Sequence, residues 1–126
     1  MKKNKFGKSV LFAVNGIAYG ISKERNIKIQ IIIGLFVILI SILLKIPQTD
    51  FIIILLVSFL VIILELVNTG IDKLIDKLSP GFDKDYGKIK DIMAGVVLLA
   101  VILSVIVGFL ILFNPIISVI TCDCYP

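Results

Sequence analysis

The stretch FIIILLVSFLVIILELVNTGIDKLIDKL, residues 51–78, decides how this chain folds. Residues 51–67 are apolar apart from Ser58 and Glu65, and a helix of roughly 20 such residues crosses a hydrocarbon core about 30 Å thick. The apolar residues that follow keep helical spacing until a Ser-Pro-Gly sequence at 79–81 stops the helix. We therefore expect a membrane-spanning helix that continues beyond the bilayer.

Two further apolar runs lie on either side of this stretch, at about 28–46 and 91–120. Because lipid offers the backbone no hydrogen-bonding partners, runs this long and continuous favour helices over the alternating strands of a barrel. The composition agrees, since the 126-residue chain is 59% hydrophobic and 17% charged. We predict an all-α membrane protein, a single integral membrane domain over 1–126, with three transmembrane helices at about 28–46, 51–78 and 91–120.

The segment before the first apolar run predicts an amphipathic surface helix over about 6–25. Its apolar residues recur on one helical stripe, formed by Val10, Val14, Ile17 and Ile21. Helices with this pattern lie in the membrane interface with the apolar stripe towards the lipid.

The basic residues indicate how the helices are oriented. Of thirteen Lys and Arg residues, seven lie at or before residue 28, where the first span begins, and five lie at 73–90, in the extension of the second span and the loop after it. Only Lys45 lies near the connection between the first and second spans. The positive-inside rule then places the N-terminus and the second loop in the cytoplasm and the C-terminus outside. Orientation thus explains the net charge of +4, and no nucleic-acid partner is expected. We also expect a polar loop over about 82–90, with Asp91 capping the third span.

Polar residues form one stripe along the second span. An ionisable group inside a bilayer is costly unless it is paired or solvated, which makes Glu65 a candidate functional residue. The alternative is a snorkelling or helix-pairing glutamate. Oxygen ligands such as the Asp72 carboxylate suit Mg²⁺, which usually brings substrate phosphates; alternatively, Asp72 belongs to a solvated face paired with nearby lysines. The stripe consists of Glu65, Asn68, Asp72 and Asp76.

Two more polar clusters flank the spans at the same predicted interface. In Lys23-Glu24-Arg25-Asn26, Glu24 could supply a second carboxylate to a metal shared with Asp72, or be ordinary juxtamembrane charge. Lys90 could contact phosphate oxygens as a point charge. Histidine is absent, so acid–base chemistry would use carboxylates. The glycine-rich loops of soluble kinases are absent too.

These motifs resemble the prokaryotic diacylglycerol kinase family, which includes the undecaprenol kinases of Gram-positive bacteria. The similarity is carried by ELVNTGID at 65–72, Asp76 and KDIMAGVVLLA at 90–100, and it extends over about 6–112. The resemblance implies a homotrimeric bundle in a bacterial cytoplasmic membrane, with active sites shared between protomers. It also implies phosphorylation of a lipid alcohol by Mg²⁺-ATP. Similarity to the Gram-positive branch favours undecaprenol, and diacylglycerol is the alternative.

The resemblance further implies roles for individual residues. Glu65 would be the general base, and Glu24 and Asp72 would hold Mg²⁺. The family usually has glutamate where this chain has Asp72, so this ligand is one methylene shorter. A non-catalytic membrane oligomer whose Glu65 binds an ion or proton is the alternative from another class. The residues implied to bind ATP are Phe12, Glu24, Asn68, Asp72, Lys90 and Asp91, and those implied to bind the lipid are Lys5, Glu65 and Ala94.

Overall fold

The structure is a computed structural model that describes residues 3–81 and 83–122. These residues form four helices: α1 (Lys3–Lys23), α2 (Arg25–Leu43), α3 (Gln48–Leu78) and α4 (Lys84–Cys122). Helices α2, α3 and α4 are each long and apolar enough to cross a membrane. The prediction of an all-α chain with three candidate membrane spans is therefore confirmed.

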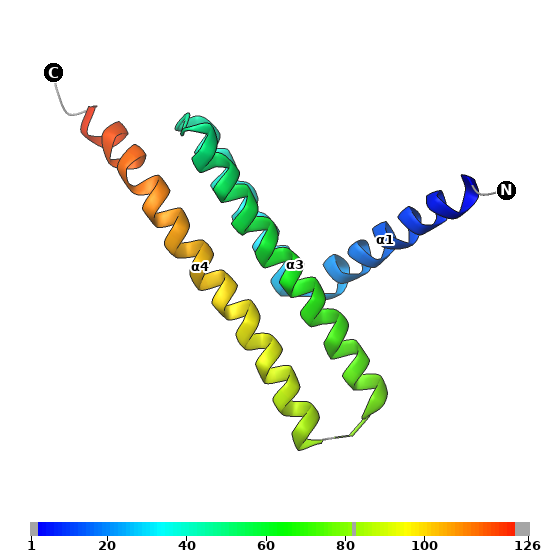
Figure 1. Cartoon of the computed structure of the whole chain (residues 1–126). Coiled ribbons are helices and arrows are strands. Elements are labelled where there is room, and N and C mark those ends of the chain that lie inside the picture. The colour runs from blue at the N-terminus through cyan, green and yellow to red at the C-terminus, as the bar shows by residue number, and fades with distance from the viewer. Residues whose placement is uncertain (1–2, 82, 123–126) are drawn as a thin grey trace.

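The three long helices form a bundle, and α1 projects from it (Figure 1). Helix α2 lies behind α3 in this view, and α4 runs antiparallel beside α3. Helix α1 leaves on the side of α3 opposite to α4, from the corner where it joins α2. A separate helix thus exists where the surface helix is expected, and its position at the membrane surface stays a prediction.

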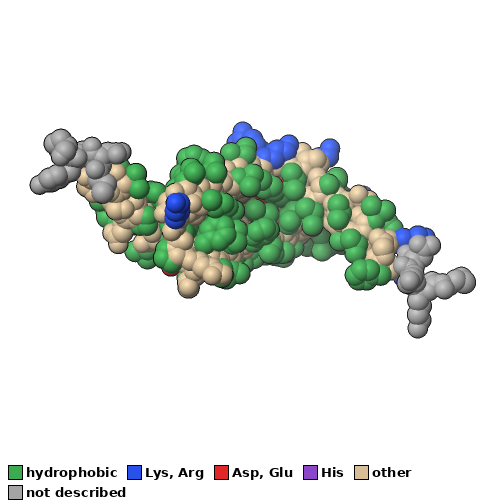
Figure 2. Space-filling view, turned by 90° about the horizontal axis from the view of Figure 1, so that it is seen from above, with side chains coloured by type: hydrophobic (Ala, Val, Ile, Leu, Met, Phe, Trp, Pro, Cys, Tyr) green, Lys and Arg blue, Asp and Glu red, His purple; other side chains and the backbone are tan. Residues whose placement is uncertain are grey.

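The core of a single chain is a narrow line of side chains between these helices. Its hydrophobic members are Ile27, Ile54, Val61, Ile75, Val97, Ala100 and Leu112. Apolar side chains cover much of the remaining surface (Figure 2). An apolar surface of this extent is stable only against lipid or other protein chains.

The connection between α2 and α3 is closed by backbone hydrogen bonds. The Lys45 amide donates to the Ile42 carbonyl at 3.1 Å, and the Ile46 amide donates to the Ser41 carbonyl at 3.4 Å. This Schellman pattern satisfies carbonyls that the end of α2 leaves free. It places Lys45 at φ 50°, a left-handed conformation that glycine usually adopts. The chain thereby reverses into an antiparallel hairpin.

Helix α4 begins earlier than its polar composition predicts. The expected loop over 82–90 is largely helical, because α4 starts at Lys84, and Asp91 lies within the helix and does not cap it. The cap is Asp83, whose carboxylate accepts hydrogen bonds from the amides of Asp85 and Tyr86 at 2.9 and 3.2 Å. An aspartate in this position satisfies free amides of the first turn, so the polar residues after it continue as a solvated helical turn.

Candidate active site

The chain bends at Glu24, between α1 and α2. The Glu24 backbone is extended, with φ −101° and ψ 120°, whereas the residues on both sides of it are helical. Its amide still donates to the Gly20 carbonyl at 3.0 Å, which keeps Glu24 against the end of α1. The bend ends the N-terminal helix at Lys23, starts the first span at Arg25, and leaves the Glu24 side chain at the corner.

Gly20 allows this corner to approach α3 closely. Gly20 is buried, and a Cβ atom added to it would lie 2.5 Å from Cδ2 of Leu66 and 3.7 Å from Cδ1 of Ile27. Ile27 is fully buried, at 0% exposure. The corner that carries Glu24 is therefore packed against the turn of α3 that carries Glu65.

We expect Gly20→Val to destabilise the protein by about 1–3 kcal/mol, because a branched side chain would overpack the contact with Leu66. The displaced corner should also move Glu24 away from α3 and lower activity. Thermal unfolding in detergent and a kinase assay measure the two effects. Gly16→Val is the matched control, since a Cβ atom at Gly16 would meet no atom of the described residues within 4 Å. Equal losses in both variants would contradict this packing role.

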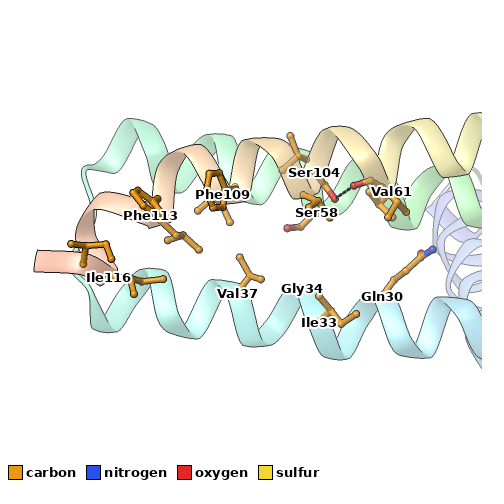
Figure 3. Close-up of a pocket in the computed structure, with 17 residues that line it drawn as sticks. Gln30, Ile33, Gly34, Val37, Ser58, Val61, Ser104, Phe109, Phe113 and Ile116 are labelled. Carbon is orange, nitrogen blue, oxygen red and sulfur yellow. Dashed lines mark hydrogen bonds between the residues drawn. The ribbon is translucent and has the colours of Figure 1, made fainter. Parts of the chain in front are cut away.

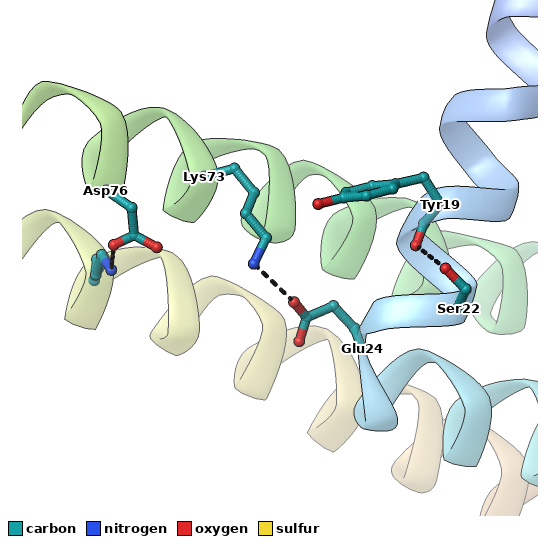
Figure 4. A network of polar contacts seen from close by, with 6 residues as sticks. Tyr19, Ser22, Glu24, Lys73 and Asp76 are labelled. Atoms are coloured by element: carbon teal, nitrogen blue, oxygen red, sulfur yellow. Dashed lines mark hydrogen bonds and ion pairs between the residues drawn. The ribbon is translucent and has the colours of Figure 1, made fainter. Parts of the chain in front are cut away.

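Two ion pairs connect α3 to its neighbours, on the side of this contact nearer to the C-terminal end of α3 (Figure 4). The Lys73 ammonium lies 3.8 Å from Oε1 of Glu24, and the Lys90 ammonium donates to Oδ1 of Asp76 at 2.6 Å. The first pair joins α3 to the α1–α2 corner, and the second joins α3 to α4. The predicted metal ligand Glu24 and the predicted phosphate ligand Lys90 therefore both reach the turn of α3 that follows Asp72.

Glu65 lies deeper in the bundle and is 4% exposed. Of the three ion pairs found in the described part of the chain, none involves Glu65. Within the described residues, two amide oxygens, Oδ1 of Asn68 and Oε1 of Gln30, are buried without a hydrogen-bond partner. Buried polar groups that lack partners are costly, so we expect a substrate, an ion or a second chain to supply the missing partners.

The polar stripe predicted from spacing runs along one continuous helix. Helix α3 is unbroken from Gln48 to Leu78, so Glu65 and Asp72 lie about 10 Å apart along it at 1.5 Å per residue. Asn68 lies between them, and both it and Asp72 are partly buried. An acid, an amide and a second acid thus follow one another along one face of α3.

An apolar groove of about 560 Å³ lies between α2, α3 and α4 and ends one turn before Glu65 (Figure 3). Ser58 and Ser104 lie along it, and Gln30 lies at the end nearer to α1. Val61 also lines the groove and is four residues before Glu65, on the same helical face. A hydrocarbon chain in the groove would therefore have its polar end near Glu65.

The site as it stands offers two carboxylates for a metal. Among the described side chains, no three acidic, Cys or His residues gather around one point. Mg²⁺, however, is usually held by one or two carboxylates together with water and substrate phosphates. Glu24 contacts Lys73, which directly follows Asp72 on α3, so the Glu24 carboxylate already pairs with a cation. The oxygen donors of Glu24 and Asp72 are of the kind that Mg²⁺ prefers.

Other residues singled out in the sequence lie away from this cluster in a single chain. Lys5 and Phe12 are exposed on the projecting part of α1 (Figure 1). Asp91 and Ala94 are exposed on α4. Sequence reasoning missed Gln30 as a site residue, although a lone amide in an apolar run was a usable signal.

Three membrane-length helices with a buried acid beside an apolar groove define a multi-pass membrane protein with an acidic site in its bundle. The family model for prokaryotic diacylglycerol kinase matches residues 11–112. The chain is also 37% identical over 111 residues to a diacylglycerol kinase of Synechocystis sp., and the alignment covers 87% of this chain and 63% of that protein. The chain belongs to the prokaryotic diacylglycerol kinase family, which confirms the resemblance seen in its motifs.

Proposed function

We propose that this protein transfers the γ-phosphoryl group of ATP to the hydroxyl of a membrane lipid alcohol. The observation that carries the proposal is the buried Glu65, which forms no ion pair among the described residues and lies one turn beyond an apolar groove. Undecaprenol is our first candidate substrate because of the similarity to the Gram-positive branch. Diacylglycerol is the second, and the name of the Synechocystis relative supports it.

Glu65 would act as the general base. With the lipid tail in the groove, the hydroxyl would come to the carboxylate, which accepts its proton. The oxygen then attacks the γ-phosphorus, and the bond to the bridging oxygen of ADP breaks. Phosphoryl transfer depends mainly on positioning and charge neutralisation, so one well-placed base and a few cationic or metal-binding groups suffice.

Glu24 and Asp72 would hold Mg²⁺, which when bound neutralises charge on the phosphates. The Lys90 ammonium would leave Asp76 and bind a phosphate oxygen in its place. The Oδ1 atom of Asn68, which has no hydrogen-bond partner among the described residues, would accept a hydrogen bond from a bound ligand or its water. Each of these groups lies on α3 or reaches it from a neighbouring helix, so nucleotide and lipid would meet along α3.

A homotrimer would complete the site. The extensive exposed apolar surface and the projection of α1 (Figure 1) support assembly with further copies. Phe12 and Asp91 would then join the nucleotide site, and Lys5 and Ala94 the lipid site, from neighbouring protomers. The protein would lie in a bacterial cytoplasmic membrane with its N-terminus and α3–α4 loop inside and its C-terminus outside, as the basic residues favour.

The test is transfer of radioactive label from γ-labelled ATP into lipid. Purified protein is offered undecaprenol and diacylglycerol in separate reactions, with and without Mg²⁺. We expect Mg²⁺-dependent label in at least one phosphorylated lipid, and the ratio between the two identifies the substrate. Label in neither lipid would contradict a kinase and favour a non-catalytic membrane oligomer that binds an ion at Glu65.

A further inference from the structure

A lysine pairs with one carboxylate of the candidate metal site, Glu24, and directly follows the other, Asp72, on α3. The Lys73 ammonium lies 3.8 Å from Oε1 of Glu24, and the two side chains are 49% and 35% exposed. Lys73 directly follows Asp72 on α3, and its side chain reaches from α3 towards the α1–α2 corner (Figure 4). A positive charge therefore lies at one of the two carboxylates that would bind a divalent cation.

Two other basic side chains of this region make different contacts. The Lys90 ammonium is bonded to Asp76, and Lys28 donates to the carbonyl of Ser22 at 3.0 Å. Lys77, one turn after Lys73 on the same helix, makes no ion pair within the described residues. Within the same residues, Lys73 is thus the ion-pair partner of Glu24.

A carboxylate that is paired with an ammonium group must exchange it before it can ligate a metal. The Lys73 ammonium and Mg²⁺ would bind the same carboxylate oxygen atoms of Glu24. Two cations so close together would repel each other. The pair is partly exposed to solvent, so its strength is modest and the exchange is readily reversible. These properties suit a replaceable counter-ion.

We propose that Lys73 is the resting counter-ion of the metal site, a positioning residue that holds Glu24 against α3 until a divalent cation displaces it. The inference rests on the proposed function, because it takes Glu24 and Asp72 as the metal ligands. In this arrangement Lys73 keeps the empty site assembled and raises the metal concentration that the site requires. Lys73 itself contacts neither the lipid nor the transferred phosphoryl group.

Binding of Mn²⁺, measured by electron paramagnetic resonance on the purified full chain without nucleotide, tests the competition. Lys73→Met should bind Mn²⁺ about threefold to fivefold more tightly than the unaltered protein, the range expected when a partly exposed ion pair is removed. Lys73→Arg keeps the charge and should match the unaltered protein. Lys77→Met removes a charge from the same helix and should change affinity much less.

A double variant separates displacement at Glu24 from a general charge effect. In the Glu24→Gln background, Lys73→Met should no longer tighten Mn²⁺ binding to the same extent, because the pair is already lost. An equal gain in both backgrounds, or equal gains from Lys73→Met and Lys77→Met, would overturn the proposal. So would the absence of Mn²⁺ binding in every variant.

The unaltered protein provides a second readout that does not depend on a variant folding. Mn²⁺ should increase the rate at which an amine-reactive reagent acylates Lys73, since the ammonium is released from Glu24, and leave Lys77 unchanged. An unchanged rate at Lys73 would refute displacement. If label still passes from ATP to lipid, the failure concerns Lys73 alone; if no label is transferred, the proposed function fails as well.

Discussion

Glu65→Gln is expected to lower the rate of phosphoryl transfer at least about 100-fold, the usual contribution of a positioned general base. The amide has nearly the same shape as the carboxylate but cannot accept the proton of the lipid hydroxyl. Because Glu65 is 4% exposed and forms none of the ion pairs of the described residues, the substitution breaks no ion pair among them. Helical content and oligomeric state should therefore stay as they are.

The measurement is initial rate with saturating ATP and lipid, accompanied by circular dichroism and size-exclusion chromatography. Asp50→Asn is the matched control, because Asp50 is a carboxylate in the first turn of the same helix at the far end from the site. It should retain activity. A Glu65→Gln variant that keeps near-normal turnover would remove Glu65 from the role of base and favour a structural or ion-binding glutamate.

Asp72→Asn is expected to have the second largest effect, a loss of about 10–100-fold in apparent affinity for Mg²⁺ during turnover. An amide oxygen carries no net charge, so Glu24 would be left as the sole carboxylate for the metal. Raising the Mg²⁺ concentration should recover part of the lost activity, which would separate a metal ligand from a residue needed for folding. Activity at several fixed Mg²⁺ concentrations gives the measurement.

Asp72→Glu makes the same test in the opposite direction. The extra methylene would lengthen the side chain that carries the proposed metal-binding carboxylate. We expect full activity at a lower Mg²⁺ concentration than the unaltered protein needs. Asp85→Asn serves as the control, since its carboxyl side chain is 91% exposed near the start of α4. An Asp72→Asn variant with an unchanged Mg²⁺ requirement would exclude Asp72 as a ligand.

Much of the architecture follows from the sequence alone. Apolar runs of membrane length determine the number of spans, because the backbone must satisfy its own hydrogen bonds in lipid. The heptad-like spacing from Glu65 to Asp72 places these residues on one face of any straight helix. The polar composition after Asp83 led to the wrong prediction of a loop, because composition alone does not distinguish a solvated helical turn from a loop. Asp83 itself was the overlooked cap.

What only the tertiary structure decided is which side chains from different helices meet. Sequence spacing carries no information on how closely α1 approaches α3; that depends on the absence of a side chain at Gly20 opposite Leu66. The same contact brings Glu24 to Lys73, a pair that sequence reasoning did not join. A residue pattern determines each helix and its faces through local geometry, whereas contacts between helices depend on packing shape, which only the folded chain defines.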